Sequence, residues 1–240
     1  MKKLICLALA VILCGAFMVS CSNTGLTSGA SGNGKDTSAS TTPVEWKDHK
    51  APKADELDMT TISSLDGVTE STAPTNYVLI KIANYGDIVV RLYPEVAPVT
   101  VKNFKNLVSQ KFYDGLIFHR VISGFMIQGG DPLGTGTGGS KTNIVGEFAS
   151  NGFENNLHHE RGVVAMARSS DPNSASSQFY ICHKNSQVAH LDGSYASFGY
   201  VVYGIEVVDA IAKVNTDSND KPLSDVVITS IRFVNVALEK

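Results

Sequence analysis

From residue 77 onward, β-branched and aromatic residues recur in short runs that glycine-rich turns separate. Residues 77–83 and 87–93 are two such runs on either side of Asn84-Tyr85-Gly86, and this spacing predicts a β-hairpin. The other runs of this kind predict strands at residues 117–122, 125–128, 163–167, 178–182, 197–203 and 226–236.

Two stretches have helical spacing instead. The first begins at Pro98 and ends near Gln110, and the second covers residues 206–213. The apolar stripe of the first consists of Val101, Phe104, Leu107 and Val108. Many short strands with only two helices predict a mainly β domain, a closed or nearly closed antiparallel sheet capped by the helices. We place this domain at residues 75–240, a length that can bury roughly 70% of its unfolded surface.

The chain before residue 75 has a different character. Lys2 and Lys3 precede an apolar run at residues 4–19, which indicates that residues 1–20 are an export signal. The run is shorter than the roughly 20 apolar residues of a membrane-spanning helix. Residues 18–21, Met-Val-Ser-Cys, resemble a bacterial lipobox. This resemblance implies that Cys21 is lipidated and holds the protein to the cell membrane, outside the cytoplasm. An ordinary cleaved signal and an uncleaved anchor are the alternatives.

Residues 21–74 are expected to be a lipid-anchored flexible linker or spacer. Residues 22–43 are mostly Ser, Thr, Gly and Asn, which bury too little apolar surface to offset the entropy of ordering. Residues 45–70 are more acidic and favour an extended spacer, although the sequence leaves open whether they pack on the domain. The apolar residues available for such packing are Trp46, Leu57, Met59, Ile62 and Leu65.

Charge and cysteine content exclude several classes of protein. The 240 residues are 43% hydrophobic and carry a formal net charge of −3, so no basic field indicates a nucleic-acid partner. The cysteines are too few and too scattered for a disulfide scaffold; they are Cys6, Cys14, Cys21 and Cys182. Cys182 lies in an apolar run, which favours a small core residue over a reactive thiolate.

Two motifs that suggest cofactors lack the context that those sites need. Residues 134–139 match G-x-G-x-x-G, but no strand precedes them and no helical stripe follows, so we expect a flexible glycine loop. His158-His159-Glu160 lacks the i, i+4 histidine spacing of a zinc motif. We therefore expect neither a nucleotide nor a metal site.

Residues 118–131, FHRVISGFMIQGGD, place a guanidinium and an amide among large apolar side chains. In a regular strand Arg120 shares one face with Phe118 and Ile122, opposite His119 and Val121. These residues alone leave Arg120 as either a charge on the sheet surface or a functional group.

This stretch resembles the signature of the cyclophilin family of peptidyl-prolyl cis-trans isomerases. Further family-like segments follow in the same order at residues 136–139, 166–168, 173–181, 191–193 and 198–199. The resemblance covers residues 77–237. It implies a closed eight-stranded antiparallel β-barrel capped by two α-helices, with the active site on the outer face and no cofactor or metal.

Carried over by position, the resemblance implies that Arg120 is the catalytic residue and that Gln178 orients it. Gln128 is expected to hold the substrate backbone, while Ala167 and Arg168 form the strand edge along which the peptide lies. The residues expected at the proline pocket, its rim and the neighbouring glycine loop are Phe125, Met126, Tyr180, Leu191, Tyr195 and Gly136.

Three positions depart from the family pattern. Tyr180 stands where Phe is usual, so its hydroxyl needs a partner or water, and the pocket floor is expected to be wetter or shallower. Arg168 stands where Asn is usual. His190 stands where many eukaryotic members carry Trp, which implies weak binding of cyclosporin.

The expected function is therefore isomerisation of X–Pro bonds in exported proteins, by a monomer that assists their folding outside the cytoplasm. The substrates are proline-containing polypeptides. Two other readings remain open: a chaperone-like module that binds proline segments without turnover, and an adhesion protein that reuses the fold.

Overall fold

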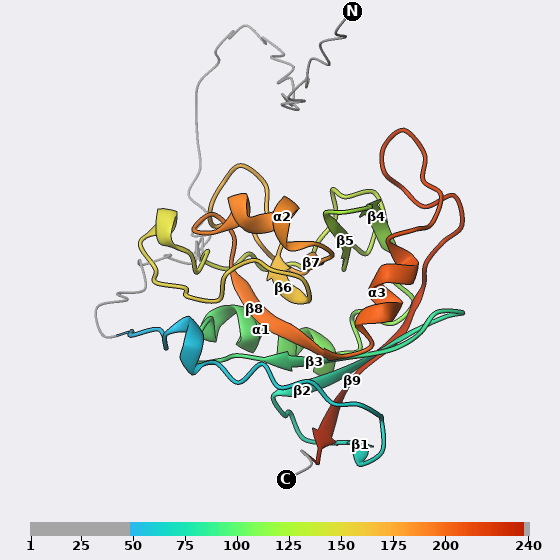
Figure 1. Ribbon diagram of the computed structural model, residues 1–240. Helices are drawn as coiled ribbons and strands as arrows, with labels where there is room; N and C mark the ends of the chain where they lie inside the picture. The colour runs from blue at the N-terminus through green and yellow to red at the C-terminus, as the bar shows by residue number, and fades with distance from the viewer. Residues whose placement is uncertain (1–48, 238–240) are drawn as a thin grey trace, which may run out of the picture. The chain divides into compact units, whose positions relative to one another are not determined.

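Nine antiparallel strands form the framework of residues 49–237, the part of the chain that our computed structural model describes (Figure 1). The export signal, the lipobox and Cys21 lie outside the described residues. The strands are β1 (Val68–Glu70), β2 (Tyr77–Ile82), β3 (Gly86–Leu92), β4 (Phe118–Ile122), β5 (Met126–Gly129), β6 (Val163–Met166), β7 (Phe179–Cys182), β8 (Ser197–Tyr203) and β9 (Ile228–Val236). The helices are α1 (Pro98–Ser109), α2 (Asn185–Val188) and α3 (Ile205–Ile211), with short 3-10 turns η1 (Ala54–Glu56), η2 (Ala149–Asn151) and η3 (Ala189–Leu191).

The strand order is β1-β9-β2-β3-β8-β6-β7-β5-β4, and this hydrogen-bonded ladder has two open ends. Near the β4 end, residues 115–118 meet residues 226–228 through one isolated bridge, Ile117 to Val227. Two backbone hydrogen bonds flank the bridge, from the Phe118 N–H to Val226 and from the Ile228 N–H to Leu116. The expected mainly β architecture is present. The expected closed ladder of eight strands is not, because this junction makes one bridge rather than a continuous run of pairs.

The apolar residues of the strands divide between two faces because side chains alternate along a strand. In β2, Val78 and Ile80 belong to the main core, which α1 and α3 also line, and Leu79 lies on the opposite face. Leu79 joins a smaller cluster with residues of β3, β8 and β9, and the partly buried Leu65 and Val68 pack against it. The outer face of the sheet is therefore apolar at this point, and a segment that precedes β2 shields it from solvent.

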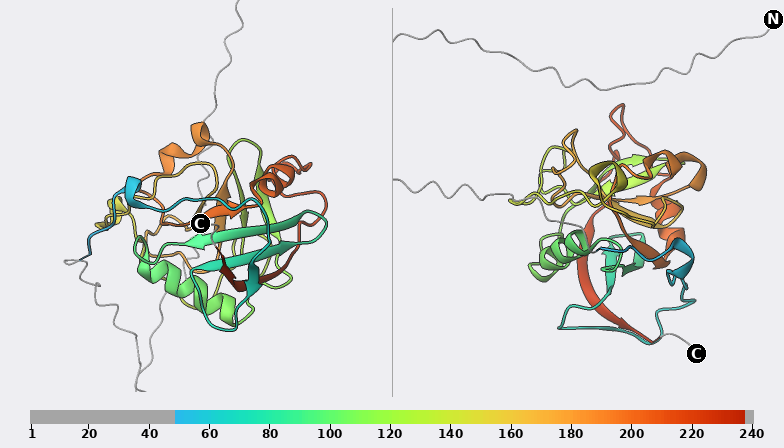
Figure 2. Two further views of the ribbon diagram at one scale, coloured as in Figure 1. Left: turned by 60° about the horizontal axis from the view of Figure 1, so that its bottom comes forward. Right: turned by 90° about the vertical axis from the view of Figure 1, so that its left-hand side faces the viewer.

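That cover, residues 57–70, we call the N-terminal strap; Figures 1 and 2 show it lying along the sheet. The Ile62 N–H donates to the Val202 carbonyl at 2.9 Å, and β1 pairs with β9. Asp58 pairs with Arg91, and hydrogen bonds from Thr60, together with Arg91, lower the pKa of Asp58 to about 2. This part of the chain is therefore not the extended spacer that its composition favoured.

Helix α1 has the apolar stripe that the sequence predicts, and a distant carboxylate completes its first turn. Glu147 is fully buried and accepts the N–H groups of Val99 and Thr100 at 2.9 and 2.8 Å. These are two of the amides that a helix start leaves without partners. Within residues 49–237, no helix combines the length and the apolar character needed to cross a bilayer.

Candidate active site

Four neighbouring strands place one residue each in a single row across the sheet. Arg120 on β4 pairs with Gln128 on β5, Gln128 with Tyr180 on β7, and Tyr180 with Ala165 on β6. Paired residues of antiparallel strands point to the same face. The residues one position along these strands belong to the main core: Val121, Ile127, Ile181 and Val164. The row therefore faces away from the main core, and the sheet itself sets the spacing of Arg120, Gln128 and Tyr180.

The strand β4 departs from the alternation that its sequence predicts. Its register with β5 shifts between Phe118 and Arg120. As a result Phe118 is fully buried in the main core and does not share a face with Arg120. His119 is also buried, and it lines the same hollow as Arg120. Because of this register shift, the Arg120 side chain is partly exposed, whereas Phe118 and His119 are both buried.

An apolar cluster adjoins the row. Met126, Tyr180 and Leu191 are nearly inaccessible, with exposed fractions of 2%, 5% and 7%. Phe125 and Tyr195 pack against the same cluster and stay partly exposed. The five residues that the family resemblance places at the proline pocket and its rim are therefore brought together, although they come from four separate segments of the chain.

The Tyr180 hydroxyl has a protein partner. It lies 2.9 Å from Nε2 of the buried His159, and Nδ1 of His159 lies 2.8 Å from Oδ1 of Asp192. Burial raises the pKa of Tyr180 well above its usual value and lowers the pKa of His159, although Asp192 acts in the opposite direction on the histidine. The additional hydroxyl is thus satisfied by the buried imidazole of His159, so it does not require water as a partner.

A pair of amide side chains connects the row to the glycine loop. Gln128 donates from Nε2 to Oε1 of Gln178 at 2.8 Å. Gln178 in turn donates from Nε2 to the carbonyls of Gly136 and Gly138, at 2.9 and 2.7 Å. Among the described residues no hydrogen bond joins Gln178 to Arg120 directly, so the expectation that Gln178 orients Arg120 stays a prediction, with Gln128 as the residue that connects the two.

Asp131 holds the glycine loop in place through hydrogen bonds to its backbone. It is 1% exposed and accepts the N–H groups of Leu133, Thr135 and Gly136. Burial alone would raise the pKa of Asp131, but the hydrogen bonds from backbone N–H groups outweigh burial and hold the pKa below its usual value. The G-x-G-x-x-G segment is thus organised by a carboxylate of this chain, which agrees with a structural loop rather than a phosphate cradle.

A second hollow, of about 480 Å³, opens beyond Gln128. Ala167 lies on its wall and donates its N–H to the Gln178 carbonyl at 2.9 Å. The guanidinium of Arg168, also on the wall, lies 5.1 Å from the Phe148 ring and 4.7 Å from the Tyr195 ring. Two aromatic rings therefore hold Arg168 in place, so the residue that replaces the usual Asn is ordered rather than free to sweep the groove.

Arg120 itself is half-buried, with 42% of its side chain exposed. Its Nε lies 3.4 Å from Oδ2 of Asp220, which comes from the loop before β9 and belongs to none of the motifs described above. Arg120 lines a hollow with Gln128, Gly136, His119 and residues of that loop. The sequence holds no local signal for this contact, since 100 positions separate the two residues.

The described residues 49–237 contain no group of three His, Cys, Asp or Glu side chains arranged to hold a metal ion. Cys182 is fully buried in the apolar cluster. Burial raises the pKa of its thiol far above the usual value, so the side chain is a protonated thiol rather than a thiolate. The groups that remain at the site are a guanidinium, a pair of amides and an apolar cluster. Such groups can bind a ligand and polarise it.

Comparisons with known proteins agree with this geometry. Residues 77–233 match the family model described as "Cyclophilin type peptidyl-prolyl cis-trans isomerase/CLD". A peptidyl-prolyl cis-trans isomerase of Arabidopsis thaliana is 40% identical over 183 residues, which are 76% of this chain and 28% of that protein. A second one from the same plant is 43% identical over 144 residues, 60% of this chain and 87% of the relative.

Among solved structures, a cyclophilin-type isomerase of Cryptosporidium parvum superposes with a TM-score of 0.59 at 34% sequence identity. The match covers 65% of this chain and 97% of that one, and the crystal was obtained in the presence of the dipeptide Ala-Pro.

Proposed function

The chain belongs to the family of cyclophilin-type peptidyl-prolyl cis-trans isomerases, and on that premise we propose that it catalyses the cis–trans isomerisation of X–Pro bonds in polypeptides. The observation that carries the proposal is the row in which Arg120, Gln128 and Tyr180 pair across three strands, with the apolar cluster of Met126 and Leu191 beside it.

The chemistry explains why these groups suffice. Rotation about a peptide bond has a barrier of roughly 18–20 kcal/mol because resonance is lost in the twisted state. X–Pro bonds are nearly balanced between the two isomers but exchange only in tens to hundreds of seconds. No covalent bond is made or broken, so the protein has to stabilise the twisted amide more than either planar form.

Arg120 has the properties for this task. As conjugation is lost, the prolyl nitrogen gains a lone pair, and a fixed donor aimed at it or at the prolyl carbonyl stabilises that state. A guanidinium is charged at all relevant pH values and offers several donors in one plane. We assign the proline ring to the surface of the apolar cluster that contains Phe125, Met126, Tyr180 and Leu191.

In our assignment the rest of the peptide extends from the apolar cluster along the amide pair of Gln128 and Gln178. In our assignment Gln128 holds the substrate backbone, and the chain continues past Ala167 toward the second hollow, which Gly136 also lines. The crystal of the Cryptosporidium parvum neighbour with Ala-Pro supports a proline-containing ligand for proteins of this fold.

A protease-coupled assay with a proline tetrapeptide tests the assignment on the full chain. We expect Arg120→Lys and Arg120→Ala to lower kcat/KM about 100-fold, the usual effect of removing one transition-state donor. The control is Arg232→Lys, which alters an arginine of β9 that pairs with Asp114. Near-wild-type turnover in Arg120→Lys contradicts the role of Arg120. If the variants lose turnover but still bind proline peptides and retain function in cells, the protein is a binding module instead.

We further propose that the enzyme acts on exported proteins outside the cytoplasm, as a lipoprotein. Support comes from the sequence: Lys2 and Lys3 before an apolar run, and a lipobox-like segment that ends at Cys21. Two or more acyl chains anchor a protein stably, whereas one does not. The mass of the membrane-extracted protein should equal that of residues 21–240 plus acyl chains. A Cys21→Ser variant that stays membrane-bound with an unchanged mass would refute lipidation.

A further inference from the structure

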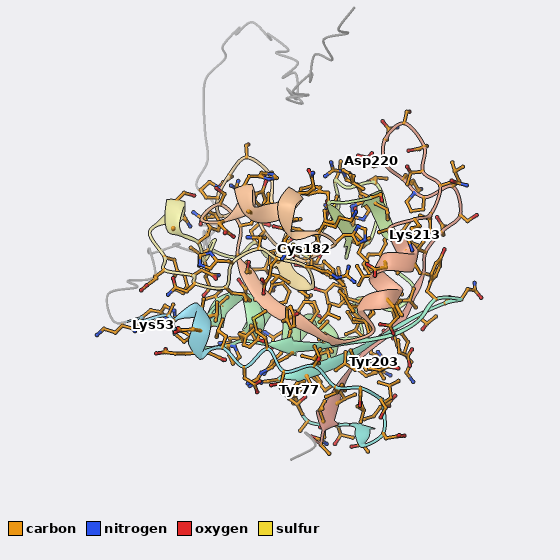
Figure 3. The ribbon with its side chains drawn as sticks, viewed as in Figure 1. Lys53, Tyr77, Cys182, Tyr203, Lys213 and Asp220 are labelled. Atoms are coloured by element: carbon orange, nitrogen blue, oxygen red, sulfur yellow. The ribbon has the colours of Figure 1, made fainter. Side chains whose placement is uncertain are left out.

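Asp220 makes the single hydrogen bond recorded for the Arg120 side chain within residues 49–237. Its Oδ2 lies 3.4 Å from Arg120 Nε. A guanidinium has five N–H donors, one on Nε and four on the two terminal nitrogens. Pairing through Nε therefore restrains the plane of the group and leaves the four terminal donors for another ligand. Figure 3 labels Asp220 in the loop beside β4.

The loop that carries Asp220 is built to hold it still. Thr216 and Pro222 form an isolated bridge at its base. Asp217 accepts the N–H groups of Asn219 and Lys221 on its Oδ1, at 2.8 and 3.0 Å. These bonds close the loop on itself, so the position of Asp220 does not depend on a flexible tip.

The same loop is attached to the strand of the arginine. The Val121 N–H donates to the Asp220 carbonyl at 2.8 Å, one residue after Arg120. Asp220 thus contacts β4 twice, through its backbone at Val121 and through its side chain at Arg120. The two contacts set the distance between carboxylate and guanidinium.

The backbone of Asp220 argues that the side chain matters. Its φ is +63°, in the left-handed region that glycine adopts most easily. Glycine would form this turn with less strain, whereas an aspartate there is tolerated. Strained residues persist where the surrounding structure uses them, and they cluster at functional sites.

The pair contributes little to stability, because both side chains are about two-fifths exposed, 42% for Arg120 and 41% for Asp220. An effect on orientation is therefore easier to detect than an effect on folding. Gln178 makes no direct hydrogen bond to Arg120 among the described residues, since its recorded partners are Gln128 and the glycine loop.

We propose that Asp220 is a positioning residue for Arg120: its carboxylate holds Nε so that the terminal N–H groups are available to the twisted X–Pro bond. The inference rests on the proposed function and extends it, since it couples the loop before β9 to turnover. Asp220 does not touch the substrate in this view, so its loss should change kcat more than KM.

Three substitutions at one position separate orientation from folding. We expect Asp220→Ala to lower kcat about tenfold with KM within twofold. Asp220→Asn keeps an oxygen that accepts the Nε–H, so it should recover most of the loss. Asp220→Gly relieves the positive φ and should be at least as stable as the wild type, yet as slow as Asp220→Ala. Asp225→Asn removes a charge from an exposed residue of the same segment and is the control.

A structural role for Asp220 would give the opposite pattern for the glycine variant, with stability and turnover both retained. That result would overturn the proposal. So would wild-type kcat in Asp220→Ala.

A double-mutant cycle gives the second readout. Lysine has a single ammonium group and lacks the guanidinium Nε–H that Asp220 accepts. In an Arg120→Lys background, Asp220→Ala should therefore have no further effect on kcat. A full tenfold additional loss in that background would show that Asp220 acts independently of Arg120. Failure of the proposal is distinct from failure of the proposed function, because the latter would appear as Arg120→Ala retaining wild-type turnover.

Discussion

The hydroxyl of Tyr180, a residue of the apolar cluster beside Arg120 and Gln128, lies 2.9 Å from Nε2 of His159. The other ring nitrogen of His159 lies 2.8 Å from Asp192, so the hydroxyl, the imidazole and the carboxylate form one chain. The hydroxyl of Tyr180 is thereby occupied by a protein partner and is not free to bind the proline ring that we assign to this cluster.

Tyr180→Phe should therefore change stability more than catalysis. Loss of the hydroxyl leaves Nε2 of the buried His159 with only Ser197, at 3.4 Å, as a partner. We expect the free energy of unfolding to fall by about 1–2 kcal/mol, while kcat/KM stays within about twofold. Urea denaturation and the proline-peptide assay measure the two quantities.

The matched control is Tyr195→Phe, which removes a hydroxyl for which the described structure records no hydrogen bond, and it should leave stability unchanged. A tenfold loss of kcat/KM in Tyr180→Phe at wild-type stability would mean that the hydroxyl contacts substrate.

Stability should fall as the solution becomes mildly acidic. Burial lowers the pKa of His119, His159 and His183 below the ordinary value of 6.5. The unfolded chain then binds more protons than the folded one, so their contribution is complete above about pH 6.5 and is lost below it. Each such histidine contributes a slope of at most about 1.4 kcal/mol per pH unit. The carboxylates with lowered pKa lose their contribution only at lower pH.

Denaturation curves at pH 7.5, 6.5 and 5.5 measure this slope. His159→Gln should make it shallower. His158→Gln, which changes a neighbouring ring that is 66% exposed and shares Asp192 with His159, should alter it less than His159→Gln does. Equal stability of the wild type at pH 7.5 and 5.5 would disprove the prediction.

The N-terminal strap should stabilise the domain. Leu65 packs over the outer apolar cluster of Leu79, Val89, Val202 and Val234. Leu65→Ala should lower the free energy of unfolding by about 1 kcal/mol, the value expected for losing part of a half-buried leucine. Ser63→Ala, at an exposed strap position, should have no measurable effect. An unchanged denaturation midpoint for Leu65→Ala would contradict the stabilising role of the strap and would support the extended spacer instead.

Cyclosporin should inhibit the enzyme only weakly. His190 stands where many eukaryotic cyclophilins carry the Trp that supports drug binding, and here its ring stacks on Phe125 with centroids 5.8 Å apart. An imidazole offers less apolar area than an indole, so His190→Trp should tighten inhibition by about tenfold or more. Inhibition constants from the peptide assay test this, and sub-micromolar inhibition of the unaltered protein would contradict it.

Most elements of this fold follow from local patterns. The hairpin of β2 and β3 and the apolar stripe of α1 are present as the periodicity predicts, since each depends on neighbours in the sequence. The predicted second helix, residues 206–213, is Ile205–Ile211 in the structure. The family motif likewise identified residues that the sheet then brings together. Local patterning succeeds here because strand and helix faces repeat every two or every 3.6 residues.

The errors arise where the structure departs from that repetition. A register shift in β4 moves Phe118 into the core, and a run of alternating residues contains no sign of it. The sparse apolar residues of the strap favour a spacer when read from the sequence, but the outer face of the sheet that they cover is itself apolar. Nor does composition reveal how the ends of a sheet meet, so the single bridge between Ile117 and Val227 was not foreseen.

By itself, then, the sequence determined the fold class, the family and the identity of the chemical groups at the site. Only the tertiary structure decided their partners: His159 for Tyr180, the glycine loop for Gln178, and Asp220 for Arg120. The physical reason is distance along the chain. Side-chain hydrogen bonds between residues 21 to 100 positions apart depend on how the strands are arranged in space, and no local repeat encodes that arrangement.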